Sequence, residues 1–224
     1  MYIPTIFEGD MGQGIKLIQE NPFGIMTVQT SQGLKSVHIP FIIKKNNDKI
    51  LLQAHLAKAN TISKELYDKE VLIHFSGPAS YVSPKWYKES SHFPTWVYCS
   101  AHAYGRLRPL SEKELDKQVD ELISINEERV NPASPWKLNE MPDDLIERMK
   151  TMIVGIEMSV DRVEICLKLN QHKSESDIDL LATRIEKNSN NHANELAEYM
   201  RQCKQSIEDE TVEMYLNKYA MSNK

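Results

Sequence analysis

The sequence predicts an α+β protein that is mainly β, built as an antiparallel barrel with helices at its periphery. Strand-like runs dominate residues 1–110. Helical patterns interrupt and follow the strands, without the regular strand-helix alternation of a doubly wound sheet. The chain also has neither a Gly-x-Gly-x-x-Gly nor a Walker A motif. With 224 residues, of which 41% are hydrophobic and 26% charged, it is long enough to bury a sizeable core.

The first strands are short and punctuated by turns. Residues 25–29 and 34–39 are separated by Thr30-Ser31-Gln32-Gly33, which predicts a hairpin. Further strands are predicted at 49–53 and 70–75. The latter runs into Ser76-Gly77-Pro78, which predicts a stop.

Two longer β segments follow. Residues 95–107 carry large polar and aromatic side chains on one face and a small face on the other, formed by Val97, Cys99, Ala101, Ala103 and Gly105. Residues 153–169 alternate twice around Asp161-Arg162, which predicts either a hairpin or one bent strand.

Four helical segments are expected. Ser111 and Glu114 form a capping box, Met141-Pro142-Asp143-Asp144 opens a second helix, and Ser174 with Asp177 opens a third. Residues 191–219 have helical composition, with Leu196, Met200, Cys203 and Ile207 at heptad-like spacing. We therefore predict a domain over 1–185 and a helical C-terminal extension over 186–224.

Charge is distributed unevenly along the chain. The net charge of −5 divides into +4 for residues 1–110 and −9 for 111–224. An acidic chain without a basic run is a poor candidate for direct DNA binding, whereas the basic first half suits a small phosphorylated ligand. No apolar run reaches the roughly 18 residues of a membrane span. With no signal peptide and three separated cysteines, the chain is expected in the cytoplasm.

Two clusters carry candidate ligand chemistry. Residues 53–60 place His55, Lys58 and Asn60 after a strand, where cation, amide and backbone N–H groups suit a phosphate; the alternative is that Asn60 or Thr61 caps a helix. Residues 93–98 bring Trp96 and Tyr98 onto one strand face, where they frame a flat ligand or form a core aromatic pair.

Other clusters are less specific. Residues 75–87 suit a rigid loop over a barrel end, and 168–174 place Gln171 at a strand end. No catalytic triad and no zinc-binding spacing is present, so no metal site is predicted, although haem needs only one histidine ligand.

The clusters together resemble the PaiB family of FMN-binding negative transcriptional regulators. The order of Met1-Tyr2-Ile3-Pro4, Asn21-Pro22-Phe23-Gly24, His38-Ile39-Pro40-Phe41, the 54–60 segment, the 77–87 segment, Pro94-Thr95-Trp96-Val97-Tyr98 and Lys168-Leu169-Asn170-Gln171-His172 is similar to that of the family over residues 1–185. The chain departs from the family pattern with Ala54 for Gly, Lys58 for Arg, Thr61 for Pro, Val97 for Asn, and Asn170 and His172 for Ser and Asn.

The resemblance implies a split β-barrel of the FMN-binding type and a homodimer with flavin sites at the subunit interface. It places the phosphate near His55, Lys58 and Asn60, and the ring or ribityl chain beside Trp96, Tyr98 and Gln171. The full set of cofactor-binding residues it implies is His38, Pro40, His55, Lys58, Asn60, Thr95, Trp96, Tyr98 and Gln171.

The implied function is negative regulation of transcription through an FMN-binding protein that acts indirectly. The sequence leaves open whether the protein is an enzyme. The alternatives are an FMN-dependent oxidoreductase of the flavin reductase type, a haem-binding or haem-degrading split barrel, and a barrel that has lost its cofactor.

Overall fold

The computed structural model describes residues 1–46, 49–67, 69–88, 92–188 and 192–203. The chain divides into two compact units, each assembled from separate stretches of sequence. Unit 1 comprises Met1–Leu17, Ser76–Ala101 and Glu164–Lys224, and unit 2 comprises Ile18–Phe75 and His102–Val163. Three strands therefore run through both units, and each unit is described by itself.

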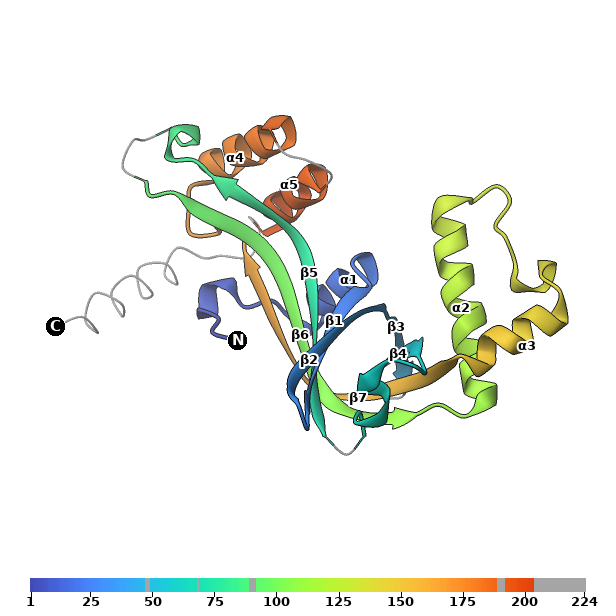
Figure 1. The fold of residues 1–224 in the computed structure, drawn as a ribbon. Coiled ribbons are helices and arrows are strands. Elements are labelled where there is room, and N and C mark those ends of the chain that lie inside the picture. The colour runs from blue at the N-terminus through green and yellow to red at the C-terminus, as the bar shows by residue number, and fades with distance from the viewer. Residues whose placement is uncertain (47–48, 68, 89–91, 189–191, 204–224) are drawn as a thin grey trace. The chain divides into compact units, whose positions relative to one another are not determined.

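The described residues form one antiparallel sheet that remains open at two edge strands (Figure 1). Its order is β2-β1-β5-β6-β7-β4-β3. The strands are β1 (Phe23–Thr30), β2 (Gly33–Pro40), β3 (Ile42–Asn46), β4 (Lys49–Ala57), β5 (Glu70–Val82), β6 (Thr95–Pro109) and β7 (Ile153–Lys168). This arrangement confirms the predicted mainly-β α+β class.

Helices occur between and after the strands. They are α1 (Met11–Glu20), α2 (Glu112–Val130), α3 (Asp143–Thr151), α4 (Glu175–Asn188) and α5 (Ala193–Gln202), with short 3₁₀ turns η1 (Thr5–Phe7), η2 (Thr61–Lys64), η3 (Pro84–Trp86) and η4 (Leu138–Glu140). In the described part of the chain, none of them is long and apolar enough to cross a membrane.

The predicted hairpin at 30–33 is confirmed. Strands β1 and β2 pair from Phe23 with Pro40 to Thr30 with Gly33, so Ser31 and Gln32 form the loop. Gly33 has a φ of 99°, a region that favours glycine. The Thr30 hydroxyl donates a hydrogen bond to the Gly33 carbonyl oxygen at 2.7 Å, which closes the turn.

The predicted stop at Ser76-Gly77-Pro78 is wrong, because β5 continues through it to Val82. Strand β1 pairs with β5 only at Leu72 to His74. Beyond that point this edge of β5 has no β1 partner, so Pro78 can lie in the strand although it has no N–H to donate.

The small face predicted for residues 95–107 is buried in the structure. Val97, Cys99, Ala101 and Ala103 are at most 2% exposed, as expected. The small side chains allow close approach: a Cβ atom on Gly77 would lie 2.5 Å from Leu17 Cδ1 and 3.0 Å from Cys99 Cβ, all within unit 1. This explains why glycine stands there.

Residues 153–168 form one strand, the second of the two predicted alternatives. All seven β4 residues from Leu51 to Ala57 pair with it, ending with Ala57 opposite Ile153. Strand β4 is therefore longer than the predicted 49–53 segment.

Helix α1 was not predicted from the sequence, although the signal for it is present. Asp10 Oδ1 accepts a hydrogen bond from Gln13 N, and Gln13 Oε1 accepts one from Asp10 N, each at 2.8 Å. This reciprocal pair is a capping box with Asp in place of Ser or Thr. Leu17 and Ile18 are buried on this helix, and Gly14 packs against Ile165 in unit 1.

The predicted C-terminal helix is observed in part. Helices α4 and α5 belong to unit 1, and Leu196, Met200 and Cys203 are buried there. Ile207 and the rest of the segment to 219 lie outside the described residues. The domain boundary at 185 stays a prediction.

Candidate functional site

The nine predicted cofactor-binding residues fall in both units. Unit 2 holds those on β2, on β4 and just after β4: His38, Pro40, His55, Lys58 and Asn60. Unit 1 holds those on β6 and just after β7: Thr95, Trp96, Tyr98 and Gln171. The predicted residues are thus divided between the two units.

The turn after β4 presents a cation beside a capped 3₁₀ helix. The Asn60 side-chain oxygen accepts a hydrogen bond from Ile62 N at 3.1 Å, so the predicted capping role of Asn60 is confirmed. Lys58 N donates to the Met152 carbonyl oxygen at 2.8 Å, which fixes the turn. The Lys58 side chain is exposed, and no carboxylate of the described residues lies within 4 Å of its ammonium. An anion can approach it.

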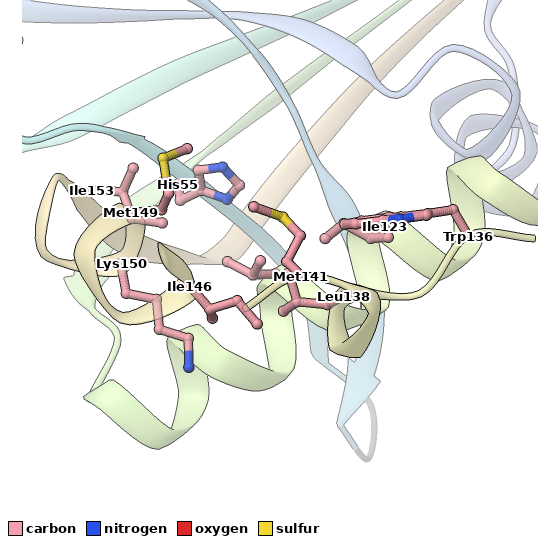
Figure 2. A pocket seen from close by; sticks show the side chains of 10 residues that line it. His55, Ile123, Trp136, Leu138, Met141, Ile146, Met149, Lys150 and Ile153 are labelled. Carbon is pink, nitrogen blue, oxygen red and sulfur yellow. The ribbon is translucent and has the colours of Figure 1, made fainter. Parts of the chain in front are cut away.

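His55 faces a different environment from Lys58. Its Nδ1 lies 2.8 Å from Gln118 Oε1 of α2, and an amide oxygen can only accept, so Nδ1 is the donor. Gln118 is fully buried, and its Nε2 has no hydrogen-bond partner within the described structure. The imidazole lines a mainly apolar cavity between β4 and the α2–α3 region (Figure 2).

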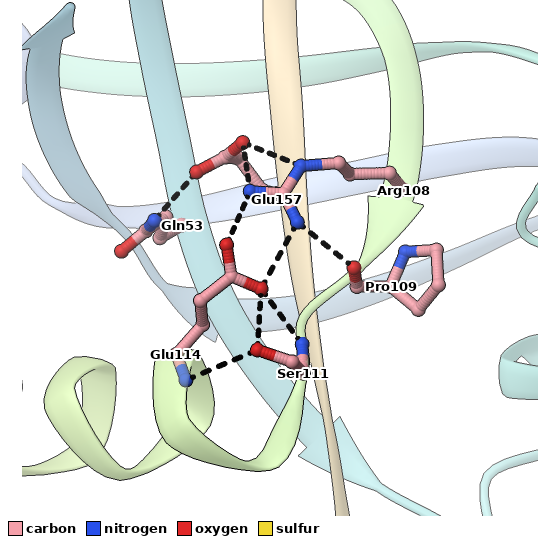
Figure 3. Close-up of polar contacts among 6 residues, drawn as sticks. All are labelled: Gln53, Arg108, Pro109, Ser111, Glu114 and Glu157. Atoms are coloured by element: carbon pink, nitrogen blue, oxygen red, sulfur yellow. Dashed lines mark hydrogen bonds and ion pairs between the residues drawn. The ribbon is translucent and has the colours of Figure 1, made fainter.

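A polar network holds α2 to the sheet next to His55 (Figure 3). Glu157 of β7 is 6% exposed and accepts hydrogen bonds from Gln53 Nε2 at 2.5 Å and Arg108 Nε at 2.8 Å. The same guanidinium contacts both Glu114 oxygens, at 2.8 and 3.1 Å. Arg108, followed by the N–H and hydroxyl of Ser111, lowers the pKa of Glu114 to about 2.

Strands β5 and β6 carry an exposed aromatic pair within unit 1. Trp96 is 58% exposed and meets Tyr81 edge to face, with ring centroids 6.1 Å apart. An exposed indole beside a second ring is a surface on which a flat ligand can stack. The predicted alternative of a core pair formed by Trp96 and Tyr98 is wrong, because Trp96 is exposed.

Tyr98 points instead toward the interior of unit 1. The Cys166 sulfur lies 3.5 Å from its hydroxyl oxygen, within hydrogen-bond distance, and Ile3 and the Ile6–Phe7–Cys166 cluster pack nearby. The hydrogen bond with Cys166, followed by burial, raises the pKa of Tyr98 to about 12. The phenol therefore keeps its proton at neutral pH. Cys166, like Cys99 and Cys203, is a buried free thiol.

Gln171 uses its amide to close the end of β7. Its oxygen accepts a hydrogen bond from Leu169 N at 2.8 Å, and its nitrogen donates to the Leu167 carbonyl oxygen. Lys168 Nζ donates to Thr95 Oγ1 at 3.0 Å. At this rim the free charge belongs to Lys168, so a ligand there meets an ammonium rather than the Gln171 amide.

The sequence analysis missed a group of cations around His172. Lys173 Nζ lies 3.1 Å from His92 Nδ1, and Tyr87 stacks on His92 with centroids 4.2 Å apart. His172 Nδ1 is buried without a partner in the described part of the chain. Burial first, then the charges of Lys173, His92 and Lys168, lower the pKa of His172 to about 4. The sequence feature that could have identified this group is the pair Lys168 and Lys173, which flanks residues 169–172.

We expect His172 to make folding stability pH-dependent. Its pKa is about 4 in the folded protein against an ordinary value of 6.5 in the unfolded chain, so below pH 6.5 the unfolded chain binds the proton first and stability falls as pH falls toward 4. Urea unfolding at pH 7 and pH 4.5 should show a loss for the native chain larger by about 2 kcal/mol than for His172→Asn.

The exposed His192 provides the control for this measurement. His192→Asn is the same substitution at an exposed imidazole and should keep the larger loss, because His172 is unchanged in it. An equal loss in native and His172→Asn chains would show that His172 does not carry the effect.

His38 and Pro40 belong to the outward side of the sheet in unit 2. His38 pairs in register with Ile25, and Ile25 pairs with His74 on β5. The His74 ring meets His102 of β6 edge to face at 4.7 Å, and burial lowers the pKa of His74. Four adjacent strands thus present a half-buried face rich in imidazoles.

The fold is that of a split β-barrel of the FMN-binding type. The conserved hypothetical protein Rv2991 from Mycobacterium tuberculosis has a similar structure, with a TM-score of 0.52, 12% identity, and coverage of 75% of this chain and 91% of that chain. At this identity the likeness shows the fold alone.

Sequence comparison then defines the family. Residues 1–162 match the model of the family described as "Putative FMN-binding domain". The protease synthase and sporulation protein PAI 2 of Bacillus subtilis is 29% identical over 203 residues, which are 89% of this chain and 96% of the relative. The uncharacterised protein AN0679 of Emericella nidulans is 32% identical over 204 residues, 73% of this chain and 81% of the relative.

The chain belongs to the PaiB family of FMN-binding proteins, as the motifs indicated. The family match supports FMN as its cofactor. Three or more potential ligands of the histidine, cysteine and carboxylate types do not come together as a metal site in the described residues.

Proposed function

We propose that the chain is an FMN-binding regulatory protein of the PaiB type that represses transcription indirectly. The observation that carries the flavin part is the exposed, unneutralised ammonium of Lys58 at the end of β4, in a chain whose family binds FMN. A phosphate is the anion this position suits, because backbone N–H groups and a 3₁₀ turn adjoin it.

Each unit by itself offers FMN one kind of contact. Lys58 would hold the phosphate, with Asn60 and His55 on the same stretch of chain and His38 and Pro40 on β2. Trp96 would stack on the ring system beside Tyr81, with Thr95, Tyr98 and Gln171 around it. When bound, FMN supplies redox chemistry that no side chain has.

The proposed regulatory role is supported by the net charge of the chain and by the name of its Bacillus subtilis relative. The net charge of −5 disfavours direct contact with DNA phosphates, so a protein partner would transmit the effect. The Bacillus subtilis relative is named for protease synthesis and sporulation. We also propose a homodimer whose flavin sites receive residues from both subunits, and a cytoplasmic location, which the three free thiols support.

Flavin binding is tested with FMN and riboflavin, which lacks the phosphate. Lys58→Ala should weaken the binding of FMN roughly tenfold or more, because a charge-assisted hydrogen bond to the phosphate is lost. The affinity for riboflavin should not change. Trp96→Ala should weaken the binding of both FMN and riboflavin. Titration calorimetry and flavin absorbance of the purified protein measure these effects.

Lys64→Ala is the matched control, since Lys64 is an exposed lysine at the end of η2. Its FMN affinity should equal that of the native chain. Equal effects of Lys58→Ala on FMN and riboflavin would contradict the phosphate assignment. NADH oxidation by the FMN-loaded protein would favour the oxidoreductase alternative, and a Soret band in the purified protein would favour haem.

A further inference from the structure

Unit 2 contains a cavity of about 220 Å³ that shares only His55 with the residues of the flavin proposal. Strands β4 and β7, helices α2 and α3, and the segment joining the two helices line it (Figure 2). Its lining residues are His55, Val119, Ile123, Trp136, Leu138, Met141, Ile146, Met149, Lys150 and Ile153. All but two of these side chains are apolar or, for Trp136, mainly so.

The one cation of this lining is neutralised. Lys150 Nζ forms ion pairs with Asp116 at 2.8 Å and Glu147 at 3.2 Å. A charged ligand would therefore be desolvated in the cavity without a free opposite charge to offset the cost. The cavity selects a neutral occupant.

His55 gives the cavity a directional polar group that can accept a hydrogen bond. Its Nδ1 donates to Gln118, and in a neutral imidazole the other ring nitrogen then accepts. Nε2 has no hydrogen-bond partner among the residues that the structure describes. A ligand with one N–H or O–H group would satisfy it.

The volume of the cavity and its lining residues limit the class of ligand further. An apolar cavity of about 150 Å³ can hold benzene, and drug-sized ligands occupy about 300 Å³ or more. A volume of about 220 Å³ lies between these limits. Trp136 and the thioethers of Met141 and Met149 are favourable neighbours for an aromatic ring.

We propose that the α2–α3 region and β4 form a binding site for a small neutral aromatic molecule of one or two rings, which donates one hydrogen bond to His55 Nε2. The site does not depend on FMN. Lys58, which carries the phosphate assignment, does not line the cavity.

Indole and 1-methylindole test the site, because they share the ring system and only indole has an N–H donor. Calorimetry on the full chain should show saturable 1:1 binding of indole. His55→Phe should weaken the binding of indole roughly fivefold to tenfold, as expected for one lost hydrogen bond. The affinity for 1-methylindole should not change.

A substitution that fills the cavity distinguishes ligand binding inside it from ligand binding on the protein surface. Ile146→Trp should abolish binding of both ligands. Leu145→Trp is the control, since Leu145 is the next residue on α3, is 37% exposed and does not line the cavity. Indole binding that persists in Ile146→Trp, or no saturable binding in the native chain, would overturn the proposal.

Repeating the titration with saturating FMN distinguishes this site from the flavin site. Unchanged indole affinity supports a separate cavity, and loss of indole binding in the presence of FMN would overturn it. If the protein binds indole and no flavin, the flavin proposal fails and the cavity stands.

Discussion

Gly105→Ala should destabilise the protein by about 3 kcal/mol, because the added methyl group has no space. Gly105 lies on β6, and a Cβ atom there would overlap the Ser159 carbonyl oxygen of β7 and lie 3.0 Å from Met158 Cγ. Backbone cannot move aside as a flexible side chain can, so the two strands must separate locally. Urea unfolding monitored by circular dichroism measures the change.

Gly12→Ala is the control for this substitution. Gly12 lies in the first turn of α1, is exposed, and a Cβ atom there would meet only Asp10 Oδ1 at 3.2 Å. Alanine in a helix should be neutral or stabilising by up to about 1 kcal/mol. A Gly105→Ala protein as stable as the native chain would show that β6 and β7 can separate without cost.

Arg108→Met should cost about 3 kcal/mol, because it leaves the buried Glu157 carboxylate without its cation. Gln53 remains as a single hydrogen-bond donor to Glu157. The substitution also releases Glu114 at the N-terminus of α2. Methionine retains most of the apolar stem, so the measured change reports the lost charge.

A double-mutant cycle isolates this effect. Glu157→Gln introduced into the Arg108→Met chain should recover part of the lost stability, because no buried charge then remains uncompensated. Arg162→Met removes the exposed ion pair with Glu70 and the stacking on Tyr104, and should cost about 1 kcal/mol. Equal costs for Arg108→Met and Arg162→Met would contradict the argument from burial.

Local patterns predicted most of the elements correctly. Alternation of large and small residues placed 95–107 as a strand with one small face, and the Ser111–Glu114 capping box placed the start of α2. Each of these patterns lies within a few neighbouring residues. The local structure that it favours therefore does not depend on residues far away in the sequence. The Asp10–Gln13 box shows the same kind of signal in a form the analysis overlooked.

Pairing across the sheet decided what local patterns could not. Gly77-Pro78 has the composition of a turn, yet β5 runs through it because the β1 partner ends before it. The extension of β4 to Ala57 likewise depends on the length of β7, one hundred residues away. A partner strand supplies hydrogen bonds that no local sequence encodes.

Ordered motifs and strand patterns in the sequence predicted the family and the strand-rich class correctly, since these need only residue type and spacing. The set of cofactor-binding residues stays a prediction. The contacts of these side chains became known from the folded chain: Gln171 turns its amide onto β7, Tyr98 faces Cys166, and His55 meets Gln118 beside an apolar cavity. Side-chain partners come from distant segments, and burial among them sets which hydrogen bonds form and which groups keep their charge.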